Sequence, residues 1–400
     1  MKLEQRIVAP GAKRILALDG GGIRGIVSLE ILARVEKLLR AKTLNASLRL
    51  ADWFDFIGGT STGAIIAACL ALGMETGEVL RFYQEAGPRM FRRAGLVERL
   101  WYRYEPNGLA EQLREILGAE TTLGSERIRT LLMMTMRNAT TDSAWPVTNN
   151  PRAMYNDPGR ANCNLRLKLW QLVRASAAAP VYFPAEAIRV GEGRFLFQDG
   201  GVTPFNNPAF QMFLMATASP YRVNWKATRK DLLVVSVGTG LTIAAEPRAE
   251  VFDLDLAEMA VTLPEALIGG AQVQQDLLCR LFGDCRFGTA LDREVGDLKG
   301  SKAPGGRKLF SYVRYNAELS DETLRELGLS GIKLGEIRKM DDARHIDELT
   351  EFGQALARAQ VREEHFAGFS MRRRAGAGVG YGVRLYTDRW RSNGTPAKHA

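Results

Sequence analysis

Two stretches of the sequence share one pattern, in which an apolar strand runs into a glycine-rich turn and then into a helix. The first joins the apolar run at residues 13–18 to the turn at 19–25 and to helical apolar spacing over 26–39. The second is FDFIGGTSTG at residues 54–63, which is followed by the helical stretch AIIAACLAL. Two such units in series predict an α/β fold with a mostly parallel sheet, whose functional site lies at the carboxyl ends of the strands.

The second turn has the spacing G-x-S-x-G over residues 59–63, which places a serine between two glycines. A serine on a tight strand-to-helix turn is held in a strained backbone conformation with its hydroxyl exposed, and the glycines keep neighbouring side chains away from it. The amino terminus of the following helix lies just behind the hydroxyl. Ser61 is therefore a candidate nucleophile.

The composition is that of an ordinary globular protein with a basic surface. Of the 400 residues, 46% are hydrophobic, and the formal net charge is +9. Such a charge favours anionic partners (phospholipid head groups, phosphates or nucleic acid), although many basic proteins bind no polyanion. The four cysteines are too widely spaced for a disulfide framework or a zinc site. Because no signal peptide or membrane-spanning run is recognised, we expect a cytoplasmic protein whose membrane contact is peripheral.

Periodicity and turn residues predict the remaining elements. Helices are expected at residues 78–104, 107–117, 165–179, 209–218, 253–267, 272–281 and 345–357. Strands are expected at residues 129–136, 185–190, 194–198, 231–237 and 309–315, and a loop at 138–164. We expect a catalytic core at residues 13–240. A helical or mixed region at 241–400 then completes or decorates that core, with a basic flexible tail from about residue 372.

The predicted helix at residues 78–104 carries apolar and basic side chains at helical spacing. Its apolar face comprises Leu96, Val97, Leu100, Trp101 and Tyr104, and arginines flank that face. Three interpretations stay open: a surface-seeking amphipathic segment, a lid over an apolar site, or a core helix with a solvated arginine face.

A serine nucleophile needs a base, and the histidines of this chain are poorly placed to be one. His345, His365 and His399 all lie in the last sixty residues, away from the strand-end motifs. Asp199 is the better candidate, because it ends a predicted strand and opens a Gly-Gly turn. Partial desolvation would raise its pKa and make it a stronger base. The alternative is an aspartate that only caps its turn.

The glycine turn at residues 20–25 offers consecutive backbone amides at a helix amino terminus, which suits an oxyanion. We expect Asp19 to cap or brace this loop, and Arg24 to organise it or add positive charge. The spacing G-x-G-x-x-G also fits a dinucleotide-binding loop, and with Val27 it fits the glycine-rich loop of kinases. No H-R-D or D-F-G string accompanies it, and the next strand ends in GGTSTG rather than in an acidic residue.

Four stretches within residues 13–240 resemble the motifs of patatin-like phospholipases. They are the motifs at residues 19–25, 59–63 and 199–201 and the run ASAAAPVYFP at 175–184. The resemblance implies a three-layer α/β/α fold with a mostly parallel central sheet. It implies hydrolysis of phospholipid acyl esters by a Ser-Asp dyad, with Ser61 as nucleophile and Asp199 as base, and without metal or cofactor. The oxyanion hole would then be formed by Gly20, Gly21, Gly22, Arg24 and Gly25.

The short lead-in and the long basic C-terminal region are similar in layout to bacterial phospholipase effectors of cyclic-oligonucleotide antiviral signalling. This similarity implies activation by a cyclic dinucleotide, a role in anti-phage defence and a membrane phospholipid substrate, with no nucleic acid polymer as partner. The oligomeric state is left open, with a homo-oligomer as one option. The competing interpretations are a nucleotide-binding module built on residues 20–25, a constitutive esterase of lipid metabolism, and a hydrolase scaffold with a dead site.

Overall fold

The computed structural model describes residues 2–90, 95, 102–242 and 256–369. The strands are β1 (Lys13–Leu18), β2 (Phe56–Thr60), β3 (Leu131–Asn138), β4 (Ser143–Thr148), β5 (Glu186–Val190), β6 (Gly193–Asp199), β7 (Leu232–Val237), β8 (Gly283–Phe287) and β9 (Phe310–Tyr315). The helices are α1 (Leu3–Val8), α2 (Gly25–Thr43), α3 (Leu50–Trp53), α4 (Thr62–Ala71), α5 (Thr76–Met90), α6 (Pro106–Leu117), α7 (Leu169–Ser176), α8 (Ala209–Thr217), α9 (Leu256–Phe282), α10 (Asp321–Glu326), α11 (Leu334–Ile337) and α12 (Ile346–Gln360).

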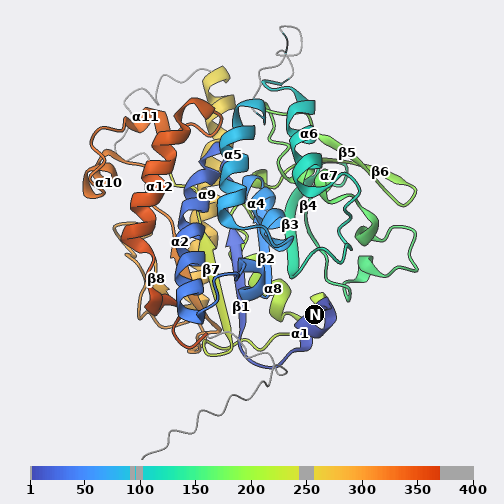
Figure 1. Cartoon of the computed structure of the whole chain (residues 1–400), viewed down its shortest axis with the longest axis horizontal. Helices are drawn as coiled ribbons and strands as arrows, with labels where there is room; N and C mark the ends of the chain where they lie inside the picture. The colour runs from blue at the N-terminus through green and yellow to red at the C-terminus, as the bar shows by residue number, and fades with distance from the viewer. Residues whose placement is uncertain (1, 91–94, 96–101, 243–255, 370–400) are drawn as a thin grey trace, which may run out of the picture. The chain divides into compact units, whose positions relative to one another are not determined.

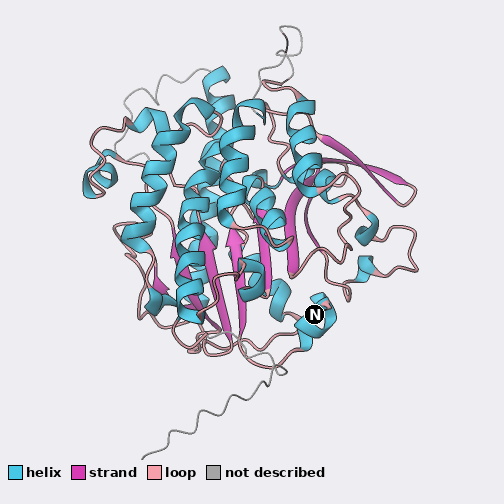
Figure 2. Cartoon of the chain, viewed as in Figure 1, coloured by secondary structure: helices cyan, strands magenta, loops and turns pink. Residues whose placement is uncertain are grey.

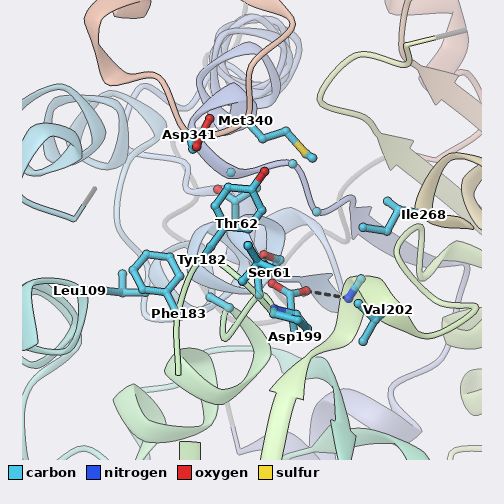
Figure 3. Close-up of a pocket in the computed structure, with 18 of the residues that line it drawn as sticks. Ser61, Thr62, Leu109, Tyr182, Phe183, Asp199, Val202, Ile268, Met340 and Asp341 are labelled. Atoms are coloured by element: carbon cyan, nitrogen blue, oxygen red, sulfur yellow. Dashed lines mark hydrogen bonds between the residues drawn. The ribbon is translucent and has the colours of Figure 1, made fainter. Parts of the chain in front are cut away.

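The described strands form one mixed sheet in the order β5-β6-β3-β2-β1-β7-β9-β8, and β4 pairs with the outer flank of β3. The central strands β3, β2, β1, β7, β9 and β8 run parallel, whereas β4, β5 and β6 join through antiparallel pairs. The parallel strands β1 and β2 end at one edge of the sheet, and the close-up in Figure 3 shows the pocket at that edge.

Helices cover both faces of the sheet, as Figures 1 and 2 show. On one face α2 packs against α5 and α12, and α4 lies directly on β2 and β3. On the other face α8 lies on β1 and β7, and α9 lies on β8 and β9. The fold is therefore the α/β/α arrangement with a mostly parallel central sheet that the resemblance of the motifs implied.

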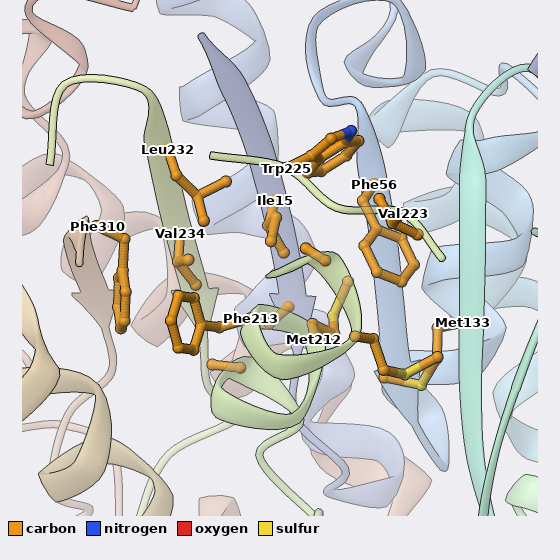
Figure 4. Close-up of a cluster of buried hydrophobic side chains, with 14 of the residues drawn as sticks. Ile15, Phe56, Met133, Met212, Phe213, Val223, Trp225, Leu232, Val234 and Phe310 are labelled. Atoms are coloured by element: carbon orange, nitrogen blue, oxygen red, sulfur yellow. The ribbon is translucent and has the colours of Figure 1, made fainter. Parts of the chain in front are cut away.

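The apolar core under α8 explains why the central strands are almost continuously hydrophobic. Alternate residues of β1, β2, β7 and β9 point to this face, and Met212 and Phe213 of α8 fill the space above them (Figure 4). Every residue of β1, β2, β7 and β9 is buried, as expected for strands that are covered on both faces.

The predicted loop at residues 138–164 is wrong over its first part, because residues 143–148 form β4. The side-chain oxygen of Asn138 accepts hydrogen bonds from the amides of Thr140 and Thr141, and this turn folds β4 back onto β3. Pro146 obscured the strand, although proline is tolerated on an edge strand.

Other helix boundaries also differ from the prediction. The two helices expected at 253–267 and 272–281 are one helix, α9, which runs through Gly269 and Gly270. Each glycine costs a helix only about 1 kcal/mol, a cost that packing against β8 and β9 offsets. Helix α7 is shorter than the expected helix at 165–179, and α1, α3, α10, α11 and β8 were not predicted.

Part of the predicted segment at 78–104 forms α5, which ends at Met90. Residues 91–94 and 96–101, with most of the proposed apolar face, and the basic tail lie outside the described residues. The proposed boundary at residue 240 stays a prediction, although β9 pairs directly with β7. Within the described part of the chain, no helix is both long and apolar enough to cross a membrane.

Candidate active site

The register of the sheet brings Ser61 and Asp199 together. Strand β2 runs parallel to β3 and ends where Thr60 pairs with Thr135. Strand β6 runs the opposite way and ends where Asp199 pairs with Met136. Because β4 occupies the other flank of β3, β2 and β6 lie on the same flank and meet end to end. The residue after Thr60 and the last residue of β6 are therefore neighbours, although 138 positions separate them in the chain.

Ser61 has the strained backbone that its motif predicts. Its φ is 55° and its ψ is −123°, and it directly precedes α4. The turn is closed tightly: a Cβ on Gly59 would lie 2.1 Å from the carbonyl oxygen of Gly63. A Cβ on Gly63 would lie 2.3 Å from the carbonyl oxygen of Leu18. Both glycines are needed because backbone atoms fill the space that any side chain would take.

The two candidate catalytic side chains are hydrogen-bonded. The Ser61 hydroxyl donates to Oδ2 of Asp199 at 2.6 Å, and the Gly201 amide donates to Oδ1 at 2.6 Å (Figure 3). Asp199 is only 4% exposed. Burial raises its pKa to about 6, against the lowering effect of the hydrogen bonds from Ser61 and Gly201 and of the nearby charge of Arg174. The hydrogen bond and the raised pKa are the two properties that a carboxylate needs to accept a serine proton.

The two described histidines lie elsewhere. His365 is buried and shares a hydrogen bond with the Tyr315 hydroxyl at 2.9 Å. His345 lies 3.4 Å from the carboxylate of Glu348. Neither lines the pocket at Ser61. His399, the third candidate base, is outside the described residues.

The glycine loop leaves two amides for a ligand. The Gly20 amide donates to Asn206, and the Gly25 amide donates back to Gly22 and Ile23. Within the described part of the chain, no acceptor is recorded for the amides of Gly21 and Gly22. Gly20, Gly21 and Gly22 line the same pocket as Ser61 and Asp199, and Gly22 has a φ of 61°.

The other two residues of the predicted oxyanion set are placed differently. Arg24 and Gly25 do not line the pocket. The guanidinium of Arg24 donates to the carbonyl of Arg338 at 3.3 Å and lies 3.5 Å from the Thr242 hydroxyl. Arg24 therefore ties the glycine loop to the C-terminal region of the chain.

The prediction that Asp19 braces its own loop is wrong. Its buried carboxylate accepts hydrogen bonds from Nη1 and Nη2 of Arg314 at 2.9 and 2.5 Å, and from Gln272 at 3.2 Å. Burial raises the pKa of Asp19, while Arg314 opposes that shift. Asp19 thus joins the end of β1 to β9 and α9. A partner 295 positions away leaves no local signal in the sequence.

A pocket of about 200 Å³ lies over Ser61 and is lined largely by apolar side chains. Figure 3 shows Leu109, Tyr182, Phe183 and Val202 around the serine, with Ile268 and Met340 completing the wall. Ile268, Met340 and Asp341 could not be predicted from the sequence, because they lie on α9 and on the loop after α11, in a region without recognisable motifs. The ASAAAPVYFP run was the only signal for the part of the wall at residues 177–183.

One group of described side chains has the composition of a metal site. Ligand atoms of Glu336, His345 and Glu348 lie within 4.8 Å of one another. None of the three lines the pocket, so the chemistry at Ser61 does not involve them directly.

The fold and site together define an α/β protein with a strained serine, a buried carboxylate and a glycine loop around an apolar pocket. The family model described as patatin-like phospholipase matches residues 16–213. Patatin-17 from Solanum cardiophyllum is 32% identical over 250 residues, which cover 57% of this chain and 60% of that protein. Patatin-T5 from Solanum tuberosum is 30% identical over 246 residues, with the same coverage.

Residues 16–213 therefore form a patatin-like phospholipase domain. The chain spans about 60% of the length of the two patatins. Among solved structures, VipD from Legionella pneumophila is 15% identical with a TM-score of 0.38, and the match covers 88% of this chain and 68% of VipD.

Proposed function

We propose that the protein is a lipid acyl hydrolase that cleaves phospholipid acyl esters with Ser61 as nucleophile and Asp199 as base. The observation that carries this proposal is the 2.6 Å hydrogen bond between the two side chains at the floor of an apolar pocket. An acyl chain in such a pocket would bring its ester to the serine. The exclusion of water would strengthen each polar interaction with the reacting atoms.

In the proposed reaction, Oδ2 of Asp199 accepts the proton of Ser61 as Oγ bonds to the ester carbon. The amides of Gly21 and Gly22 and the amino terminus of α2 stabilise the oxyanion. The tetrahedral intermediate expels the lysolipid alkoxide, which takes the proton from Asp199. A water then gives its proton to Asp199 and attacks the acyl carbon. As this second intermediate collapses, Asp199 returns the proton to Oγ of Ser61 and the fatty acid is released.

Fatty-acid release from phosphatidylglycerol vesicles tests the dyad. We expect Ser61→Ala and Asp199→Asn each to lower the rate by roughly 10³-fold or more, because only the binding and oxyanion contributions remain. Near-normal release by either purified, folded variant would contradict the dyad.

A nucleotide-binding module is the second candidate function, supported by the G-x-G-x-x-G spacing alone. Labelling by a fluorophosphonate probe separates the two candidates. Stoichiometric labelling that is lost in Ser61→Ala supports the hydrolase, whereas no labelling together with tight nucleotide binding supports the module.

We further propose that the enzyme is cytoplasmic and acts at the inner membrane surface, that a cyclic dinucleotide activates it, and that it serves in anti-phage defence. This part of the proposal rests on the short lead-in, the long basic C-terminal region and the net charge of +9. A lipase assay across a panel of cyclic di- and trinucleotides tests the switch. Full activity without any nucleotide, unchanged by all of them, would favour a constitutive esterase of lipid metabolism.

A further inference from the structure

The wall of the apolar pocket contains a charged pair that the proposed reaction does not use. Among the described lining residues, only Arg103, Asp199 and Asp341 carry a formal charge, and Asp199 belongs to the dyad. Arg103 lies 3.6 Å from Asp341, and its side chain is 46% exposed. A charged pair in an otherwise apolar wall needs a separate explanation, because it adds no apolar contact for an acyl chain.

Two donors on one short segment converge on the same oxygen. The Tyr104 hydroxyl donates to Oδ2 of Asp341 at 2.8 Å, and Nη1 of Arg103 faces the same atom at 3.6 Å. The backbone fixes this segment, since the amides of residues 103 and 104 donate to the carbonyls of Val181 and Tyr182 at 2.9 and 3.0 Å. The Arg103 guanidinium lies over the Tyr182 ring, 5.3 Å from its centre. These contacts with the pocket wall therefore hold Arg103 and Tyr104 in place.

The carboxylate comes from another part of the chain. Asp341 follows Met340, whose carbonyl accepts the Ile23 amide of the glycine loop at 2.8 Å. Both Met340 and Asp341 face the pocket beside Ser61 (Figure 3). Asp341 thus follows a residue that binds the glycine loop, contacts the two donors and lines the same pocket as Ser61.

We propose that Arg103 and Tyr104 form a phosphate subsite for the substrate's head group, and that Asp341 occupies this subsite when no lipid is bound. The inference rests on the proposed function, because a phospholipid carries its phosphodiester on the same glycerol as the ester at Ser61. A phosphate oxygen can accept the Tyr104 hydrogen bond and pair with the Arg103 guanidinium, as the carboxylate oxygen does. The long, half-exposed contact between Arg103 and Asp341 is of the weak kind that an incoming anion can replace.

Direct binding tests the subsite without any turnover. In the Ser61→Ala protein, we measure the affinity for a short-chain phosphatidylglycerol and for the diacylglycerol with the same chains. Adding Arg103→Gln should weaken phosphatidylglycerol binding about tenfold, the low end expected for a charge-assisted hydrogen bond to an exposed group. Diacylglycerol binding should change much less. Equal weakening of both lipids, or of neither, overturns the inference.

Two variants control this result. Asp341→Asn removes the competing charge and should tighten phosphatidylglycerol binding a few-fold, whereas weaker binding would show that Asp341 orients Arg103 instead of occupying its site. Lys226→Gln breaks an exposed ion pair with Asp231 away from the pocket and should leave both affinities unchanged. Added salt should reduce the difference between the lipids in the parent protein but not in the Arg103→Gln variant.

A soluble phosphodiester is the other source of the same chemistry. Glycerophosphoglycerol, the head group without acyl chains, should compete only weakly. If cyclic di-GMP binds more tightly than the lipid and loses that affinity in Arg103→Gln, the subsite belongs to a soluble ligand and the inference fails. Failure of the proposed function has a different signature, because the wild type would release no fatty acid while the lipid preference in binding persisted.

Discussion

At the scale of single residues, the candidate site depends on the burial of Asp199 beside the Ser61 hydroxyl. Ser61 and Asp199 could be selected because each stands at a glycine turn after a strand, and the structure places them 2.6 Å apart. The burial that raises the pKa of Asp199 comes from the whole pocket, and no local pattern encodes it. Arg103 and Asp341 were not selected as site residues for the same reason.

The raised pKa of Asp199 predicts an acid limb in the rate profile. Asp199 must be ionised to take the serine proton, so kcat/KM should fall about tenfold per pH unit below about pH 6 and level off above about pH 7. A soluble short-chain ester assayed from pH 4 to 9 provides the profile.

The midpoint pH of the acid limb in kcat/KM tests whether Asp199 has the raised pKa. A midpoint near 4 would mean that Asp199 behaves as a solvated carboxylate, which contradicts its burial. Asp199 also affects stability, because its pKa is higher in the folded than in the unfolded protein. Its contribution to the free energy of unfolding favours the folded state at low pH and declines as the pH rises through about 6.

At the scale of elements, the strand-turn-helix unit from β2 to α4 could be predicted almost residue for residue. Its glycines, its apolar strand and its helix all appear in one short stretch. The hairpin of β3 and β4 and the length of α9 could not be predicted in this way. In each element, tertiary contacts override a local signal. That signal is Pro146 in β4 and the Gly-Gly pair in α9.

The tight packing of this unit predicts the effect of Gly63→Ala. The new Cβ would meet the backbone oxygens of Leu18 and Asp19 at 2.3 and 2.7 Å, so α4 must move away from the end of β1. We expect esterase activity to fall by roughly 10²-fold or more, because a shift of about 1 Å at the nucleophile is enough for that loss.

Gly77→Ala is the matched control, because Gly77 also lies in the first turn of a helix but its added Cβ meets nothing within 4 Å. This variant should keep its activity, and its unfolding free energy should change by no more than about 1 kcal/mol. Equal activity of the two variants in the same assay would refute the packing argument.

At the scale of the whole molecule, the segment after the family match completes both the sheet and the site. Strands β7, β9 and β8 extend the sheet beyond β1, and Phe310 lies in the same apolar core as Phe56 (Figure 4). Arg314 holds the end of β1 through Asp19, and residues 340 and 341 face the serine. The sequence could not reveal this role, because these contacts join positions about 300 residues apart.

The buried pair of Asp19 and Arg314 predicts a large stability effect. Asp19→Asn would leave the Arg314 guanidinium, which is 2% exposed, without its counter-charge. We expect the free energy of unfolding in urea to fall by about 3–5 kcal/mol.

A double variant and a surface variant are the controls for this measurement. Asp19→Asn with Arg314→Met should recover part of the lost unfolding free energy, because it also removes the unpaired buried charge of Arg314. Lys226→Gln, which breaks an exposed pair, should cost less than about 1 kcal/mol. An unfolding free energy within 1 kcal/mol of the wild type for Asp19→Asn would show that the pair contributes little.

The link from the glycine loop to Arg314, Met340 and Asp341 also has a consequence during synthesis. A ribosome completes Ser61 and Asp199 while these later residues are still untranslated. The nascent chain therefore carries Ser61 and Asp199 before it has the contacts that hold the end of β1 and the glycine loop in place. The order of the chain thus delays assembly of the candidate site until residues 314–341 have been made.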